Sequence, residues 1–367
     1  MIKKITIQNF FSFGTEQTIE LNADTNVLVG INGAGKSNFI KAIRLLKASI
    51  EGDFEKLFSQ RWGAFDGVAN FIDPYADEIN ITYVFSKESI NKHAFIRYAN
   101  DDIFYNLHIR RVFRGYSIFQ ESILENEHIL MEREDGDKWS NNEDYDIFLS
   151  ILHIVKKLAV YDYFDTSFES PIRQLSPYYS EENLLSDGKN LTTLLSYLNG
   201  NSIKVFDKLV EEFKNINPNF REIVFTTPVA GKSLMSLKEK NLDRAITIEH
   251  ISDGTLRYLL LLSIFYNPKR GSVVCLDEPE MGLHPDMING IARGIKYAAQ
   301  NGTQMIIATH SPLLLNAFEL EDLMIFEKNE ANETIVKKVS EEDFPDWEGE
   351  FLAGQMWLRG QIGGKRW

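Results

Sequence analysis

The feature of this sequence that most constrains its fold is the glycine-rich run at 30–37, Gly-Ile-Asn-Gly-Ala-Gly-Lys-Ser. An apolar segment at 25–29 precedes it and predicts a buried strand, and the segment after it has the apolar spacing of a helix. Glycines let backbone N–H groups approach an anion, and the helix presents the positive end of its dipole to the same anion. A strand, a loop of this form and a helix together indicate a P-loop, which binds nucleotide phosphates.

The P-loop pattern assigns roles to individual residues. Lys36 is expected to reach the β- and γ-phosphates of ATP, and the hydroxyl of Ser37 is expected to bind Mg²⁺. The other predicted nucleotide contacts come from the loop and the start of the helix: Asn32, Gly33, Ala34, Gly35 and Asn38. The alternative is a glycine-rich turn without a ligand, which fits the strand–loop–helix context less well.

Composition limits the class of protein. The chain has 367 residues, a net charge of −14 and a single cysteine, Cys275, so no intramolecular disulfide can form and the cytoplasm is expected. No apolar run approaches the ~18 residues that a membrane-spanning helix needs, so we expect no membrane partner. An acidic chain repels phosphate backbones at long range; net charge does not support nucleic-acid binding, although local basic clusters leave it open.

A second apolar segment ends in two adjacent carboxylates. Residues 273–276 are Val-Val-Cys-Leu, and Asp277 and Glu278 follow them. Such strands are common and mostly structural, but downstream of a P-loop this one has the form of a Walker B element. Asp277 is then expected to hold Mg²⁺, directly or through water, and Glu278 to polarise the attacking water. The two motifs together predict ATP hydrolysis.

Two shorter motifs each have an ordinary structural interpretation. Ser252, Asp253 and Gly254 precede an apolar helix, where serine is a common N-cap. His310 follows an apolar strand, where a histidine is usually a surface or capping residue.

The order of these motifs resembles the RecF/SMC-like ABC ATPases. It is more closely similar to the standalone bacterial ATPases related to the ATPase half of OLD-family nucleases. The resemblance rests on the P-loop, Ser-Asp-Gly-Thr at 252–255, Asp-Glu-Pro-Glu-Met-Gly-Leu-His-Pro at 277–285 and Thr-His-Ser-Pro at 309–312. It implies that residues 252–254 are the signature loop, which completes the nucleotide site of a second protomer. It also implies that His310 is the switch histidine, which would hydrogen-bond the γ-phosphate.

The same resemblance implies an α/β fold, the head of an ABC-type P-loop NTPase. Its parts would be a mixed β-sheet with flanking helices, an antiparallel β subdomain and a helical insertion; no segment sustains the heptads of a long coiled coil. We expect an N-terminal lobe at 1–135, a helical insertion at 136–245, a C-terminal lobe at 246–340 and a Gly/Trp-rich tail at 341–367. Within them, strands are predicted at 79–85, 94–98 and 104–113, and helical blocks at 146–158 and 191–215.

Several parts of the chain depart from the family pattern or lack a role. Asp253 replaces the middle glycine of the common signature, and His284 stands where transporters carry aspartate. Gln60 and Gln120 are both candidates for the Q-loop. Four further segments resemble the family without suggesting a function: Phe164–Ser167, Pro171–Arg173, Asp187–Leu191 and Trp357–Gly364.

The resemblance also bears on partners. Two protomers of such ATPases sandwich two ATP molecules head to tail, so a homodimer or a higher even-numbered oligomer is expected. Relatives act in anti-phage defence or DNA repair, often beside a nuclease or toxin. Since only about 40 residues follow the last core strand, we expect a separately encoded effector. The alternatives are a RecF-type repair ATPase, a nucleotide-gated scaffold with little turnover, and a transporter subunit, which the long insertion and the Ser-Asp-Gly-Thr signature disfavour.

Overall fold

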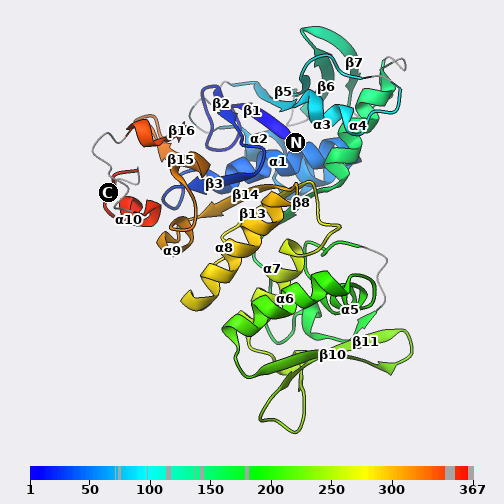
Figure 1. Ribbon diagram of the computed structural model, residues 1–367. Coiled ribbons are helices and arrows are strands. Elements are labelled where there is room, and N and C mark those ends of the chain that lie inside the picture. The colour runs from blue at the N-terminus through cyan, green and yellow to red at the C-terminus, as the bar shows by residue number, and fades with distance from the viewer. Residues whose placement is uncertain are drawn as a thin grey trace. The chain divides into compact units, whose positions relative to one another are not determined.

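The computed structural model describes most of the chain as two compact units. The described residues are 1–70, 72, 76–96, 98–112, 117–135, 137–140, 144–177, 182–343 and 352–362. The first unit comprises 1–158, 319–351 and 356–367, and the second comprises 159–318 and 352–355. Both units combine strands with helices (Figure 1), which confirms the predicted α/β class.

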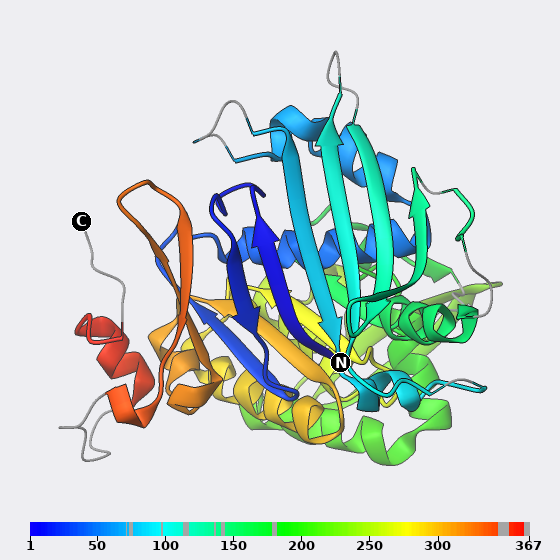
Figure 2. The ribbon, with the colours of Figure 1, turned by 90° about the horizontal axis from the view of Figure 1, so that it is seen from above.

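An antiparallel sheet of six strands dominates the first unit, in the order β2-β1-β4-β5-β6-β7. Its strands are β1 (Ile2–Gln8), β2 (Gln17–Glu20), β4 (Glu78–Phe85), β5 (Ile103–Arg111), β6 (Ser117–Glu125) and β7 (His128–Glu134). One face is buried against α1 (Lys36–Glu51), as Figure 2 illustrates, and Tyr83 Oη donates to the Ala42 carbonyl at 2.6 Å. The predicted antiparallel β subdomain is therefore present.

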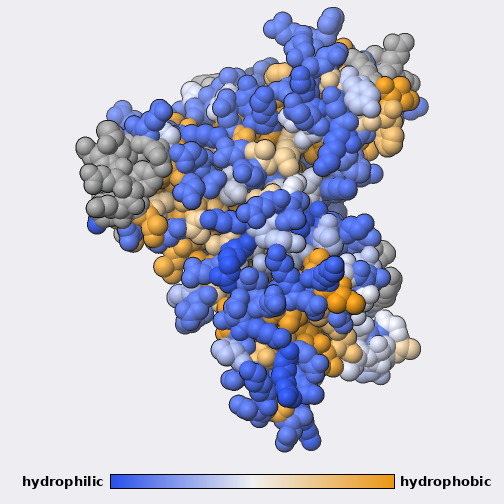
Figure 3. Space-filling view, in the orientation of Figure 1, coloured by the Kyte–Doolittle hydropathy of each residue, from blue (hydrophilic) through white to orange (hydrophobic). Residues whose placement is uncertain are grey.

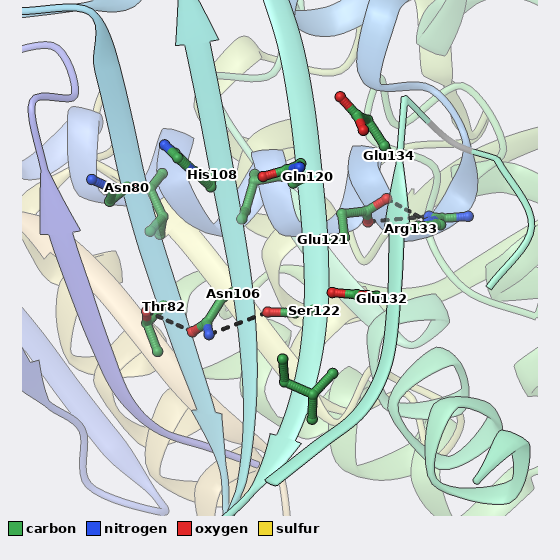
Figure 4. A pocket seen from close by; sticks show the side chains of 13 residues that line it. Asn80, Thr82, Asn106, His108, Gln120, Glu121, Ser122, Glu132, Arg133 and Glu134 are labelled. Carbon is green, nitrogen blue, oxygen red and sulfur yellow. Dashed lines mark hydrogen bonds and ion pairs between the residues drawn. The ribbon is translucent and has the colours of Figure 1, made fainter. Parts of the chain in front are cut away.

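The opposite face of this sheet is polar. Two rows of paired side chains cross β4 to β7 there, and Figure 4 shows them: Asn80, His108, Gln120 and Glu134, then Thr82, Asn106, Ser122 and Glu132. Within the second row, Thr82 Oγ1 donates to Asn106 Oδ1 at 2.8 Å, and Asn106 Nδ2 donates to Ser122 Oγ at 3.4 Å. The rows line a hollow of about 620 Å³. Alternation along each strand accounts for this solvated face.

A second, mixed group of strands in the first unit carries the glycine-rich loop. Strand β3 (Thr25–Val29) runs parallel to β15 (Leu323–Lys328), which pairs antiparallel with β16 (Thr334–Lys338). The run at 323–326 is fully buried and continues the sheet beside β3.

The remaining helical elements of the first unit are short, apart from one. They are the π-helix η1 (Lys56–Arg61), α2 (Ala64–Val68), α3 (Lys87–Asn91), α4 (Tyr145–Lys156), and the 3₁₀ turns η5 (Leu320–Asp322) and η6 (Glu341–Asp343). Helix α4 confirms the helical block predicted from residue 146.

The strand predicted at 94–98 is wrong. The side chains of Phe95 and Ile96 are 85% and 88% exposed, and the backbone N–H groups of both residues donate to the Asp146 carboxylate at 3.0 Å. These apolar residues lie in a loop before β5, where no neighbouring strand pairs with them in the described part of the chain. The apolar residues at 94–98 predicted a strand, but the local structure is a loop.

Parallel strands and packed helices form the centre of the second unit. Strands β13 (Val273–Asp277) and β14 (Gln304–Thr309) are parallel, and β8 (Leu158–Tyr161) begins with the last residue of the range 1–158 and continues into the second unit. The helices are α7 (Asp253–Phe265), α8 (Pro285–Gln300) and α9 (Pro312–Leu315). Glycines on α8 allow close packing against α7, since a Cβ at Gly290 would lie 1.9 Å from Tyr258 Oη.

The insertion contains both helices and strands. Helices α5 (Leu191–Asn201) and α6 (Ile203–Ile216) confirm the block predicted at 191–215. The same region also contains a hairpin that the sequence did not suggest, with short flanking elements: η3 (Pro171–Arg173), β9 (Ser176–Pro177), β10 (Phe220–Val229), β11 (Lys232–Glu239), β12 (Ile246–Thr247) and η4 (Ile248–His250). The four predicted domain ranges stay predictions.

The C-terminal segment is described only in part. Helix α10 (Ala353–Leu358) contains the buried Trp357, whereas Trp347, Trp367 and residues 363–364 lie outside the described residues. Within the described ranges, no helix has the length and apolar character needed to cross a membrane. The face of the molecule in Figure 3 is largely hydrophilic, with separate apolar patches.

Candidate nucleotide site

The glycine-rich loop turns between β3 and α1 through left-handed backbone. Gly33 and Gly35 have φ angles of +82° and +112°, which disfavour any residue with a Cβ. Gly35 is also the N-cap of α1, so it offers no side chain to the first N–H groups of the helix. Those groups and the positive end of the helix dipole suit a phosphate. The geometry has the features that the P-loop pattern predicts.

Lys36 lies folded against the loop. Its side chain is buried, and Nζ donates to the Gly30 carbonyl at 2.6 Å and to the Ile31 carbonyl at 3.2 Å. Two backbone carbonyls therefore hold the ammonium beside the loop. Ser37, Asn32 and Gly33 are exposed on the same loop.

Two residues that the sequence did not indicate support the loop from behind. Thr334 Oγ1 lies 2.8 Å from the Ala34 carbonyl oxygen and 2.7 Å from Ser12 Oγ. Asn38, predicted as a nucleotide contact, donates from Nδ2 to the same Ser12 hydroxyl at 2.8 Å. A Cβ at Gly35 would lie 2.2 Å from Thr334 Oγ1, so this support fits only a glycine.

In the second unit, the two adjacent carboxylates stand at the end of β13. Asp277 pairs with Ala308 of β14, and the Glu278 N–H donates to the Ala308 carbonyl at 2.8 Å. Glu278 has a φ of +50°, a left-handed conformation that is costly for a residue with a Cβ and often marks functional sites. Glu278 Oε1 lies 3.1 Å from Nδ1 of His310, which is half exposed. Glu278 and His310 are thus brought together as a carboxylate–imidazole pair.

A third acidic residue, Glu280, belongs to this site although no role was predicted for it. Thr309 Oγ1 donates to Glu280 Oε1, and the Ser311 N–H donates to Thr309 Oγ1 at 3.0 Å. Burial raises the pKa of the Glu280 carboxyl above its ordinary value, against the opposing effect of the Thr309 hydrogen bond and the nearby His310. Its place within Asp-Glu-Pro-Glu was the only sequence signal.

The predicted signature residues lie at the start of α7. Ser252 is the N-cap, and its Oγ accepts from the Thr255 N–H at 3.3 Å, so the ordinary capping role is present. Ser252 and Asp253 are both exposed. Asp253 Oδ1 accepts from Arg173 Nη2 at 2.5 Å.

The residues that departed from the family pattern have local explanations. His284 caps α8, because its Nδ1 accepts from the Asp286 N–H at 3.3 Å. Gln120 lies in the polar rows of Figure 4, and Gln60 is an exposed residue of η1. Neither observation selects one of them as the Q-loop residue.

Comparison with known sequences adds relatives for both units. Residues 25–316 match the family model described as "AAA domain, putative AbiEii toxin, Type IV TA system". The chain is 25% identical over 382 residues to Old nuclease of Escherichia phage P2, a match that covers 93% of this chain but 61% of that protein. It is 20% identical over 361 residues to an ATP/GTP phosphatase of Helicobacter pylori (strain ATCC 700392 / 26695), covering 94% and 93% of the two chains. The chain therefore spans less than two thirds of Old nuclease and nearly all of the phosphatase.

Comparison with solved structures identifies the fold. An Smc head bound to the C-terminal winged-helix domain of ScpA superposes with a TM-score of 0.61 at 15% identity, covering 92% of this chain and 97% of that one. An Smc head with an extended coiled coil, bound to the C-terminal domain of ScpA from Pyrococcus furiosus, also gives 0.61, at 14% identity and 95% and 98% coverage. The predicted fold of an ABC-type ATPase head is confirmed. Since the family model extends from the strand before the glycine-rich loop past His310, the chain belongs to the AAA-domain family described as putative AbiEii toxin. It is an ABC-type ATPase that is similar in sequence to Old nuclease and shares the fold of the Smc heads.

Proposed function

We propose that ATP closes two copies of this chain into a head-to-tail dimer and that hydrolysis by Glu278 opens it. The Glu278–His310 pair carries the hydrolytic part of this proposal. Glu278 follows directly after β13 with a φ of +50°, and its Oε1 lies 3.1 Å from His310 Nδ1. A carboxylate held this way suits the polarisation of an attacking water.

The loop at 30–37 would hold the triphosphate. Lys36 would exchange its two backbone carbonyl partners for the β- and γ-phosphates, while the N–H groups at the start of α1 bind phosphate oxygens. Mg²⁺ would compensate the charge of the phosphates when bound. Its protein ligands would be Ser37 and Asp277; the described residues contain no group of three or more His, Cys, Asp or Glu side chains suited to a metal, so the phosphates would supply further ligands.

The signature loop supports a dimer. The loop at 252–254 is exposed at Ser252 and Asp253 and lies at the positive end of α7, a helix of 13 residues, where Ser252 and the backbone N–H groups could meet the phosphates of a second protomer. Apolar side chains stand close to this point, since Arg257 of α7 stacks on the half-exposed ring of Tyr163 at 4.0 Å and donates to the Met281 carbonyl at 3.4 Å. Exposed apolar groups beside a polar recognition loop are typical of interfaces.

We further propose that the dimer controls a separately encoded effector, in anti-phage defence. The match to Old nuclease and the toxin in the family description both support an association with an effector. The alternatives are a RecF-type repair ATPase and a scaffold with little turnover, the second favoured by the Smc heads that carry a ScpA domain. Turnover measured with and without DNA, and with the product of the neighbouring gene, separates these roles.

The variant Glu278→Gln tests the core of the proposal. The amide keeps the shape of the side chain but cannot act as a base, so we expect turnover to fall by about 100-fold or more while ATP still binds. With ATP and Mg²⁺, the variant should accumulate as a dimer in sedimentation experiments. Lys36→Ala is the control, and it should neither bind ATP nor dimerise. Equal ATPase rates in the parent and in Glu278→Gln would overturn the assignment, and a Glu278→Gln monomer at saturating ATP would overturn the dimer.

A further inference from the structure

One buried arginine connects the insertion to the signature loop. The Arg173 side chain is 6% exposed, and all three of its nitrogens are engaged. Nε donates to the Thr166 carbonyl at 2.8 Å, and Nη2 donates to Asp253 Oδ1 at 2.5 Å. Nη1 donates to three carbonyls just before α7, those of Ile248 at 3.0 Å, Glu249 at 3.1 Å and Ile251 at 2.7 Å. A single guanidinium therefore fixes the peptide groups from 248 to 253.

The insertion holds this arginine in a tight local structure. Arg173 ends the 3₁₀ turn η3, which Ser170 caps by accepting from the Ile172 N–H at 3.3 Å. Ser170 Oγ also donates to the Asp165 carbonyl at 2.6 Å, and Asp165 Oδ1 accepts from the Ser167 N–H at 2.9 Å. The segments 164–167 and 171–173, which had no role in the sequence, thus form one hydrogen-bonded unit around Arg173.

A third segment without a role packs on the same unit. Gly188 has a φ of +71°, and a Cβ there would lie 2.8 Å from Leu260 Cδ2 on α7 and 3.1 Å from Ile172 Cδ1. The loop at 187–191 therefore packs between α7 and η3. We call residues 164–173 and 187–191 together the insertion clamp.

We propose that Arg173 is the positioning residue of the signature loop and that Asp253 serves as its anchor rather than as a phosphate ligand. This role rests on the proposed function of that loop. Asp253 stands where related signatures carry glycine, and its carboxylate would repel an incoming phosphate if it were uncompensated. The ion pair with Arg173 compensates that charge, and the side chain of Asp253 is 61% exposed, so only the arginine side of the pair is buried. Ser252 Oγ and the backbone N–H groups would remain to meet the phosphate.

The test uses ATP-dependent dimerisation in the Glu278→Gln background, measured by sedimentation together with binding of a fluorescent ATP analogue. Arg173→Ala should raise the ATP concentration needed for dimerisation by about 10- to 100-fold, because the signature loop would no longer be held in position to meet the nucleotide of the second protomer. Binding of the analogue to the monomer should stay within about twofold, because the residues of the P-loop lie in the other unit.

Arg270→Ala is the matched control. Arg270 lies in the same unit and also bonds backbone carbonyls, those of Asn267 at 2.9 Å and Ala298 at 3.1 Å, but at the opposite end of α7 from the signature. It should lower the melting temperature and leave dimerisation unchanged. An equal dimerisation defect in both variants would show general destabilisation and overturn the proposal, as would normal dimerisation of Arg173→Ala.

Two further variants separate positioning from folding. Asp253→Ala keeps Arg173 on its four carbonyls, so dimerisation should stay within about threefold of the parent; a complete loss would make Asp253 a ligand and overturn its role as an anchor. Arg173→Ala combined with Asp253→Gly should recover part of the defect, because the uncompensated carboxylate is removed. No recovery would overturn the charge argument. If the Glu278→Gln parent itself fails to dimerise, the proposed function fails first, and that outcome is distinct from all of these.

Discussion

The P-loop at 30–37 and the signature loop at 252–254 are held by different kinds of interaction. Backbone conformation holds the first, through the left-handed Gly33 and Gly35 and a lysine that bonds to its own loop. A distant side chain holds the second, since Arg173 bonds four carbonyls and the Asp253 carboxylate. The P-loop should therefore be sensitive to a side chain added at its glycines, and the signature loop should be sensitive to the loss of the Arg173 charge.

The largest loss of stability and nucleotide affinity is expected from Gly35→Ala. Left-handed backbone costs a residue with a Cβ about 1–2 kcal/mol. At Gly35 the new methyl group would also lie 2.2 Å from Thr334 Oγ1, which adds the cost of overpacking, about 1–3 kcal/mol. Gly33→Ala is the matched control, because its φ is also positive but a Cβ at that position would have no neighbouring atom within 4 Å.

Titration with a fluorescent ATP analogue and thermal unfolding would compare the two glycine variants. Gly35→Ala should lose both stability and most of its nucleotide affinity, whereas Gly33→Ala should show only the smaller conformational cost. Equal losses would mean that φ alone matters and that the support from Ser12 and Thr334 is unimportant.

The same contrast explains what the sequence could predict. The P-loop, β13 and α7 are encoded by contiguous residues, an apolar run followed by glycines, carboxylates or a cap, and such patterns can be read locally. The Thr334 contact to Ala34 joins residues 300 positions apart, and the Arg173–Asp253 pair joins residues 80 apart. The sequence singled out Asp253 and the segment Pro171–Arg173 but did not link them, and no local pattern marked Thr334, so the support of both loops required the structure.

Some strand predictions failed for a related reason. The apolar side chains at 95–96 suggested a strand that does not form, while β15 and the β10–β11 hairpin were missed. Whether an apolar run becomes a strand depends on a partner strand, and the partner of β15 is β3, which is nearly 300 residues earlier in the chain. Burial beside β3, rather than intrinsic propensity, decides that case.

A smaller effect is expected from Glu280→Gln in the second unit. Burial raises the pKa of Glu280 above 4.5, so the folded state binds the proton more tightly than the unfolded chain. Its contribution to stability is complete below pH 4.5 and is lost as the pH rises through the folded pKa. Glutamine cannot ionise and can still accept from Thr309 Oγ1. The variant should therefore melt above the parent at pH 8, by about 2–4 °C, and the difference should shrink towards pH 5.

Thermal melts from pH 5 to pH 8 would check this expectation. A variant that is less stable than the parent at every pH would mean that the site needs the charged carboxylate of Glu280. ATPase assays of the same variant would then decide whether the carboxylate acts through His310.

The smallest effect on stability is expected from substitution of His93 in the first unit, and its dependence on pH is opposite to that of Glu280. Burial lowers the pKa of His93 from 6.5 to about 4. The second cause is the positive charge that His153 would carry, since the centroids of the two rings lie 4.2 Å apart. The unfolded chain therefore binds this proton more tightly, and stability is lost as the pH falls from 6.5 towards 4. His93→Gln should shift acid unfolding to lower pH by a few tenths of a unit, and His153→Gln should do so less, because burial is the larger cause.

An NMR titration of the His93 ring should have its midpoint near 4, and a midpoint near 6.5 would contradict the argument. If both expectations hold, acid destabilises the first unit through His93 whereas rising pH destabilises the second through Glu280, so the two halves of the ATPase would respond to pH in opposite directions.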